Sequence, residues 1–169
     1  MIGKKMEKAL NAQLNAEYYS SYMYLSMAAY FESIDLPGFA NWMRVQTQEE
    51  EFHALKFFDY LVERAGRVAL QAIDAPPTEW SSPLNAFEET LKHEQKVTAL
   101  INDLLFLARD ERDNAAEIFL QWYVTEQVEE EDSVNKILAQ LRLIKDKPQG
   151  LFMLDKELSQ RSFTPPASE

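Results

Sequence analysis

The sequence predicts an all-α protein: a four-helix bundle with one long crossover connection, plus a short fifth helix at the C-terminal end. Apolar residues recur every three to four positions in four long segments, at about residues 4–33, 37–65, 83–110 and 113–143. Only 4 glycines occur among 169 residues, which argues against a turn-rich β protein. The periodicity lapses over residues 66–82, so this segment supplies the crossover.

Start and stop signals separate the predicted helices. The Pro-Gly pair at 37–38 interrupts the first periodic segment and suits the start of the second. The Pro-Pro pair at 76–77 forbids a helix within the crossover. Ser82 is a suitable N-cap for the third helix, and Pro83 fits its first turn.

The lengths of the connections predict the topology. A helix of about 28 residues is roughly 40–45 Å long, and the crossover can span that length. Short links join helices one to two and three to four, which makes two antiparallel hairpins. The fifth helix is expected over 151–161, and the Pro-rich end, 162–169, is expected to pack loosely. We treat residues 1–169 as one domain, because this length suits a single hydrophobic core.

Composition excludes several classes of function. The chain has no cysteine, which rules out disulfides, thiolate metal sites and cysteine nucleophiles. Its net charge of -11 disfavours a nucleic-acid partner, because no basic stripe is present to neutralise phosphates. No apolar run is long enough to span a membrane, and the charged start does not resemble a signal peptide. A cytoplasmic location is therefore expected.

Each of the four apolar stripes is interrupted by polar groups near its midpoint. Because mid-helix positions lie at the same level whichever way a helix runs, these groups should meet at the centre of the bundle. They are Glu17 in the first helix, Glu50 and His53 in the second, Glu94 in the third, and Gln127 and Glu130 in the fourth.

Four buried carboxylates would repel one another or be forced to protonate, unless cations neutralise them. Two divalent cations would cancel the four negative charges. Glu50 and His53 lie three residues apart on one helix face and can bind a shared metal, with Glu17 as a further ligand. Glu94 and Glu130 would hold the second metal, with Glu50 as the bridge. Oxygen-rich ligation with one imidazole suits iron, manganese or zinc.

Other polar and aromatic residues surround this predicted centre. Glu49, Glu126 and Glu129 could form a third, more exposed metal site, or simply a solvated acidic face. Tyr24 lies two turns after Glu17, where it could bond to a ligand carboxylate or donate an electron. Trp122 could be a second electron donor or an ordinary core residue. His93 is expected to face solvent.

Four stretches of the chain closely resemble the prokaryotic non-haem ferritins, over about residues 5–161. These stretches are LNAQLNAEYYSSYMYLSMAAYF, GFANWMRVQTQEEEFHALKFFDYLVERAGRV, PPTEWSSPLNAFEETLKHE and FLQWYVTEQVEEEDSV. The fold that this resemblance implies is the ferritin-like four-helix bundle, with one long crossover and a short fifth helix.

The resemblance also implies specific roles. It implies that the ferroxidase-centre ligands are Glu17, Glu50, His53, Glu94 and Glu130, with Gln127 lining the centre and Tyr24 as its nearby tyrosine. It implies a third iron site made by Glu49, Glu126, Glu129 and Glu130. Glu117 is a candidate for an iron-entrance channel. Glu51 and Glu130 replace residues that bacterioferritins use, so no haem is expected.

The function implied by the resemblance is iron storage with ferroxidase activity. Fe(II) would be oxidised by O2 or H2O2 at a centre of two irons and stored as a ferric oxyhydroxide mineral inside a homo-oligomeric shell, typically of 24 subunits. Two alternatives remain open: a small di-iron oxidase or peroxide scavenger that stores nothing, and a helical structural protein with a metal-independent carboxylate network.

Overall fold

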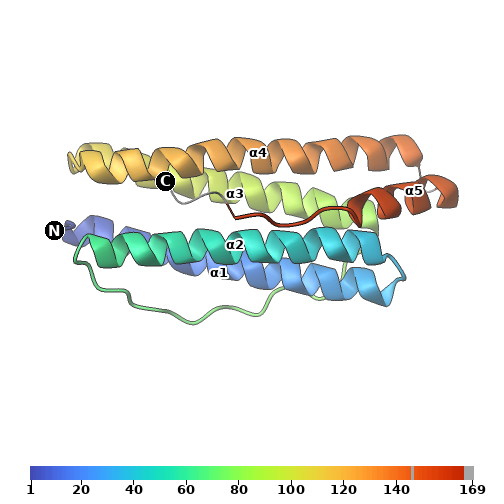
Figure 1. The fold of residues 1–169 in the computed structure, drawn as a ribbon, viewed down its shortest axis with the longest axis horizontal. Helices are drawn as coiled ribbons and strands as arrows, with labels where there is room; N and C mark the ends of the chain where they lie inside the picture. Colours follow the sequence, from blue (N-terminus) through green and yellow to red (C-terminus); the bar gives the residue numbers. More distant parts are fainter. Residues whose placement is uncertain (146, 166–169) are drawn as a thin grey trace.

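The computed structural model describes residues 1–145 and 147–165, and it confirms the predicted all-α bundle with one long crossover (Figure 1). Its helices are α1 (Lys4–Ser33), α2 (Pro37–Glu63), α3 (Pro83–Asp110), α4 (Asn114–Ile144) and α5 (Pro148–Leu158). The first four lie close to the expected ranges. α5 begins and ends earlier than the expected 151–161, because a proline suits the first position of a helix.

The starts of α3 and α4 are capped by side chains, as their residue types predict. The Ser82 side chain accepts a hydrogen bond of 3.0 Å from the backbone N–H of Asn85, and Pro83 begins α3. Asp113 accepts a bond of 3.1 Å from the backbone N–H of Ala116 at the start of α4. These bonds satisfy donors that a helix start leaves free.

The helices pack as two pairs, α1 with α2 and α3 with α4, and the crossover runs along the α1–α2 pair (Figure 1). Side chains of α1 hold this long connection in place. Asn11 donates to the backbone oxygen of Arg67 at 3.0 Å and accepts from the backbone N–H of Ala69 at 2.6 Å. Ser26 donates to the backbone oxygen of Pro77 at 2.6 Å. The crossover therefore delivers the chain to the far end of the bundle along a fixed path. In the part of the chain described here, no helix is long and apolar enough to cross a membrane.

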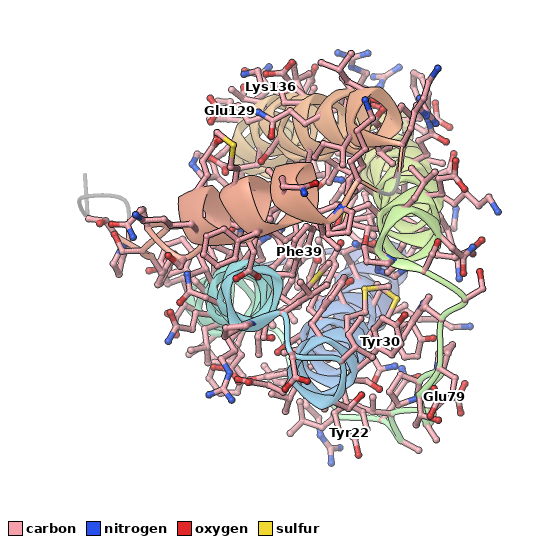
Figure 2. The ribbon with its side chains drawn as sticks, turned by 90° about the vertical axis from the view of Figure 1, so that its right-hand side faces the viewer. Tyr22, Tyr30, Phe39, Glu79, Glu129 and Lys136 are labelled. Atoms are coloured by element: carbon pink, nitrogen blue, oxygen red, sulfur yellow. The ribbon has the colours of Figure 1, made fainter. Side chains whose placement is uncertain are left out.

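The core consists of two apolar clusters, one in each half of the bundle. One contains Met27, Phe39 and Phe87; the other contains Leu10 and Phe57. Figure 2 shows Phe39 between the helices, whereas Glu129 lies on the outer side of α4. The two clusters are separated at mid-height by buried polar side chains, and these are the groups that interrupt the predicted stripes.

α5 packs against the start of α2 through an unusually close approach. The Asp155 carboxylate accepts hydrogen bonds from the backbone N–H groups of Gly38, at 2.7 Å, and Phe39, at 3.0 Å. A Cβ atom on Gly38 would lie 1.7 Å from the backbone oxygen of Asp155. Only glycine therefore allows this contact, and α5 is held in one orientation.

The chain beyond α5 packs more closely than expected. The Phe163 ring centroid lies 6.1 Å from that of Phe52 on α2, and Figure 1 shows this segment running back between α2 and α4. The expectation of a loose end is wrong for residues up to Phe163, since aromatic packing holds them. Residues 166–169, which the same expectation covered, lie outside the described part of the chain.

Candidate metal centre

All four long helices contribute buried polar side chains to one layer at the middle of the bundle. Every one of them is at most 7% exposed, although five of the six are ionisable. They are Glu17 from α1, Glu50 and His53 from α2, Glu94 from α3, and Gln127 and Glu130 from α4. The structure thus brings together the residues that the interrupted stripes indicated.

Glu17, Glu50 and His53 form the tightest group in this layer. Each offers a ligand atom within 4.8 Å of the others, and His53 Nδ1 lies 3.4 Å from Glu50 Oε2. Glu17 Oε1 accepts a hydrogen bond of 2.9 Å from Gln13. Among the described residues, Glu17 Oε2 is the buried side-chain atom left without a hydrogen-bond partner. A buried carboxylate oxygen in this state is suited to a cation.

Glu94 and Glu130 differ from this group, because neutral donors already hold their oxygens. The Tyr24 hydroxyl donates to Glu94 Oε1, and Gln127 donates to Glu94 Oε2 at 3.1 Å. Gln46 donates to Glu130 Oε2 at 2.6 Å. The layer is therefore asymmetric: neutral donors hold both oxygens of Glu94 and one oxygen of Glu130, whereas Glu17 Oε2 has no such donor.

Burial dominates the electrostatics of the layer. It raises the pKa of Glu50 and of Glu130 well above the usual value, and repulsion from Glu94 adds to both shifts. Burial likewise raises the pKa of Glu17, and it raises that of Glu94 to about 6. The pKa of Tyr24 is raised well above its usual value by burial and by the charge of Glu94. Without a cation, the layer therefore tends to hold protons.

The chemistry of the donor set fits two hard or borderline divalent cations. It offers carboxylate oxygens from four helices and one imidazole, which suits Fe(II), Mn(II) or Zn(II). Two such ions would replace the protons and neutralise the four carboxylates. Water is largely excluded at this depth, so the attraction between ion and ligand is weakly screened.

The more exposed acidic cluster, Glu49, Glu126 and Glu129, is arranged differently. Glu49 and Glu126 are half-buried, Glu129 is exposed, and the three do not form a ligand group as tight as the buried one among the described residues. Burial raises the pKa of Glu49 and of Glu126, and repulsion from Glu129 and Glu49 adds to the shift at Glu126. Glu49 is paired with Arg161 at 2.5 Å.

The structure also shows the surroundings of three other residues that the sequence analysis named. His93 is not solvated as expected: it is half-buried, its Nε2 lies 2.7 Å from Ser20 Oγ, and burial lowers its pKa to about 4. Trp122 lies beside the centre, with its ring 5.4 Å from that of His53. Glu117 accepts a bond of 2.8 Å from Arg109 near the start of α4.

Sequence reasoning missed four residues that support the layer. Gln13 and Gln46 lie one turn before Glu17 and Glu50, so the helical spacing could have identified them. The other two are Tyr123, whose hydroxyl donates to the backbone oxygen of His53 at 2.8 Å, and Arg161. Arg161 comes from a separate segment, so no local spacing connects it to Glu49.

The sequence and the fold are similar to those of known proteins. Residues 7–144 match the family model described as Ferritin-like domain. The bacterial non-heme ferritin of Bacteroides fragilis is 42% identical over 161 residues, which cover 95% of this chain and 100% of that protein. The corresponding protein of Staphylococcus epidermidis is 40% identical, over 96% of this chain and 98% of its own.

Solved structures of archaeal ferritins are also similar. A closed form of the Archaeoglobus fulgidus ferritin, engineered by mutagenesis, is 57% identical with a TM-score of 0.96, over 97% of this chain and 100% of that one. The structure described as a novel open pore ferritin of the same organism has 57% identity and a TM-score of 0.95, over 96% and 100%. The chain therefore belongs to the ferritin family and is a prokaryotic non-haem ferritin.

Proposed function

We propose that this chain oxidises Fe(II) at the buried carboxylate layer and stores the product as a ferric mineral. Membership of the ferritin family supports iron storage. The observation that carries the oxidation site is the unpartnered, buried Oε2 of Glu17 beside Glu50 and His53. Without a cation, that oxygen is stabilised by a proton shared with the neighbouring Glu50 carboxyl, and a bound cation would take the place of this proton.

The layer has ligands for two Fe(II) ions as substrates. Glu17, Glu50 and His53 bind the first, and Glu94 and Glu130 bind the second, with Glu50 shared between them. The repulsion between Glu50, Glu94 and Glu130 supports this assignment, because it is relieved when positive charge lies among them.

The two iron positions fill in a defined order. The first needs little rearrangement, since Glu17 Oε2 is free and His53 is already within 3.4 Å of Glu50. The second requires Glu94 and Glu130 to exchange hydrogen bonds from Gln127 and Gln46 for bonds to iron. The first iron therefore binds more tightly, and the second is exchanged more easily.

Tyr24 acts on the second position. Its hydroxyl donates to Glu94, so it orients that carboxylate and lies close enough to supply an electron. Burial and the charge of Glu94 raise the pKa of Tyr24, so the phenol stays protonated and the hydrogen bond is kept. Gln127 supports the same carboxylate from α4. Trp122, beside His53, is a second possible donor.

The overall oxidation is 4 Fe(II) + O2 + 4 H+ → 4 Fe(III) + 2 H2O, and H2O2 can replace O2 as the oxidant. Because the layer binds protons when iron is absent, iron binding displaces them. Fe(III) then leaves for mineral deposition inside a hollow homo-oligomeric shell, which we propose to contain 24 chains. The assembly proposal rests on relatives named as ferritins and on the structural similarity.

The outer acidic cluster supplies a third iron site. Glu49, Glu126 and Glu129 lie beside Glu130, and the mutual repulsion of Glu126 with Glu129 and Glu49 supports cation binding. Greater exposure makes this site weaker than the buried pair, because water screens its charges. Such a weak site suits iron in transit, either toward the two buried iron positions or away from them.

Two measurements test the proposal. Anaerobic Fe(II) titration should show saturable binding of two to three ions per chain, whereas a passive helical bundle would show none. Native mass should correspond to a large shell. A dimer that oxidises iron would instead favour the small di-iron oxidase or peroxide scavenger.

A further inference from the structure

Two contacts fix the chain just beyond α5. Asp155 attaches α5 to the start of α2 through the backbone N–H groups of Gly38 and Phe39. Asn41 then donates to the backbone oxygens of Leu158, at 3.1 Å, and Arg161, at 3.0 Å. The position of Arg161 along α2 is therefore set by the fold, and not by a chance surface contact.

The Arg161 side chain packs against α2 and reaches Glu49 of the outer acidic cluster. Its guanidinium carbon is 4.4 Å from the centre of the Trp42 ring. One nitrogen donates to Gln46 Oε1 at 2.7 Å, and the other donates to Glu49 Oε2 at 2.5 Å. The side chains of Arg161 and Glu49 are 23% and 22% exposed, so water screens this pair only in part.

Gln46 connects this contact to the buried layer. Its Oε1 accepts from Arg161, and its Nε2 donates to Glu130 Oε2 at 2.6 Å. Because the guanidinium can only donate, it fixes the orientation of the amide, with the NH2 group toward Glu130. Arg161 thus acts on two proposed iron ligands at once, on Glu49 directly and on Glu130 through Gln46.

The geometry points to Arg161 as a resident cation of the outer acidic cluster, which a metal ion must displace from Glu49 in order to bind there. This inference rests on the proposed role of the cluster as a third iron site. Arg161 is a positioning residue in this scheme: its guanidinium orients the Glu49 carboxylate and occupies the place of a cation beside it while no metal is bound. Lys56 also lies near the cluster, but its ammonium group packs on the Trp122 ring and interacts electrostatically with Glu126.

Displacement of Arg161 has two consequences. The affinity of the outer site is lowered, because each binding event must break a partly buried ion pair. Gln46 also loses its partner, so its amide is free to turn and release Glu130. Occupation of the outer site therefore changes the hydrogen bonding of Glu130, which belongs to the second buried iron position and also borders the outer site. An ion bound tightly at the outer site would stop further iron from passing through it. Competition from Arg161 keeps binding at that site weak and so keeps it passable.

The test uses the apo-protein and Tb3+, an oxygen-seeking ion whose luminescence is excited through tryptophan. Wild type and Glu126→Gln are titrated first. The binding component that is weaker in Glu126→Gln is assigned to the outer site. Arg161→Gln should then bind Tb3+ at that component roughly tenfold more tightly than wild type. A residue with a purely structural role would give the opposite result, because its loss would disorder the site and weaken binding.

Arg44→Gln is the matched control. Arg44 also lies on the exposed side of α2 and carries the same charge, but it pairs with Glu32 at 3.2 Å and does not contact Glu49. The expected result is wild-type affinity. An equal gain in Arg44→Gln and Arg161→Gln would overturn the inference, because only net charge would then matter. Unchanged or weaker binding in Arg161→Gln would overturn it as well.

The outcomes also separate this inference from the proposed function. If Glu126→Gln and wild type give identical titrations, the outer cluster is not a metal site, and both ideas about it fail. If Glu126→Gln loses a component while Arg161→Gln behaves as wild type, the third site stands and only the role of Arg161 is wrong. Native mass of each variant verifies that the particle is intact before titration.

Discussion

The buried carboxylate layer and the outer acidic cluster are made by adjacent residues, yet their environments are opposite. Glu50 is 2% exposed and faces other carboxylates and His53. Glu49, the preceding residue, is half-buried and paired with Arg161. On α4, Glu130 is buried whereas Glu129 is exposed. One step along a helix turns a side chain by about 100°, which is enough to move it from the bundle interior toward the solvent.

Under the proposed function, this difference lets one region hold an iron ion and the neighbouring region pass it on. In the buried layer, carboxylates repel one another in a medium that screens weakly, so we expect a divalent cation to bind strongly. In the outer cluster, water screens the negative charges, and Arg161 offsets the charge of Glu49. We therefore expect metal binding there to be weaker and more easily reversed. In the proposed function, the buried layer would oxidise iron and the outer cluster would transfer it.

Removal of Glu50 should have the largest effect, since its carboxylate is shared by both proposed buried iron positions. We expect Glu50→Ala to slow aerobic Fe(II) oxidation by about a hundredfold or more, followed by ultraviolet absorbance. Glu51→Ala changes an exposed neighbour on α2 and should keep the wild-type rate. If Glu50→Ala oxidises iron as fast as wild type, the shared role of Glu50 is wrong.

Zinc should stabilise the apo-protein more at neutral than at acid pH. Burial raises the pKa of Glu94 from 4.5 to about 6, so the folded chain holds a proton more tightly than the unfolded chain. The stability that this proton contributes is fully present below about pH 4.5 and is lost as pH rises through about 6. Above that pH, a metal ion must supply the positive charge instead.

The expected result is a rise in the thermal unfolding midpoint of about 5–10 °C with saturating Zn(II) at about pH 7.5, and at most half of that at about pH 5. Scanning calorimetry measures both. Glu50→Ala, which loses the shared ligand, should show little shift at either pH. Equal shifts at the two pH values in wild type would mean that the layer does not exchange protons for metal.

Tyr24→Phe should have an intermediate effect. The variant keeps the ring packed but removes the hydrogen bond to Glu94, so the second iron is less well oriented. We expect Fe(II) oxidation to slow about tenfold, with the number of bound ions unchanged. Tyr22→Phe, on the exposed side of α1, is the control. A loss of bound iron would show that Tyr24 serves binding and not orientation.

The smallest effect is expected from the outer cluster. Glu126→Gln should lower the anaerobic Fe(II) stoichiometry by about one ion per chain, while the initial oxidation rate stays within about threefold of wild type. Asp132→Asn, an exposed acid further along α4 that pairs with Lys136, is the control. If Glu126→Gln reduced the rate as much as Glu50→Ala, the two regions would not be functionally separate.

Much of the fold and of the buried layer was predictable, because both follow from the helical period. Glu17, Glu50, Glu94 and Glu130 interrupt apolar stripes at matching depth, and the structure places all four in one layer. His93 was misjudged for a related reason: it faces away from the layer, but the neighbouring α1 covers it through Ser20. The period of one helix says nothing about what covers its other faces.

The sequence by itself determined four long helices, their connections and the depth of the polar positions, since local spacing decides which side chains share a helix face. Tertiary structure alone decided which oxygen of Glu17 is free, that Gln46 reaches Glu130, and that Arg161 lies on Glu49. These contacts join segments far apart in the chain. They depend on how α5 approaches Gly38, on packing angles and on side-chain rotamers, none of which a local period encodes.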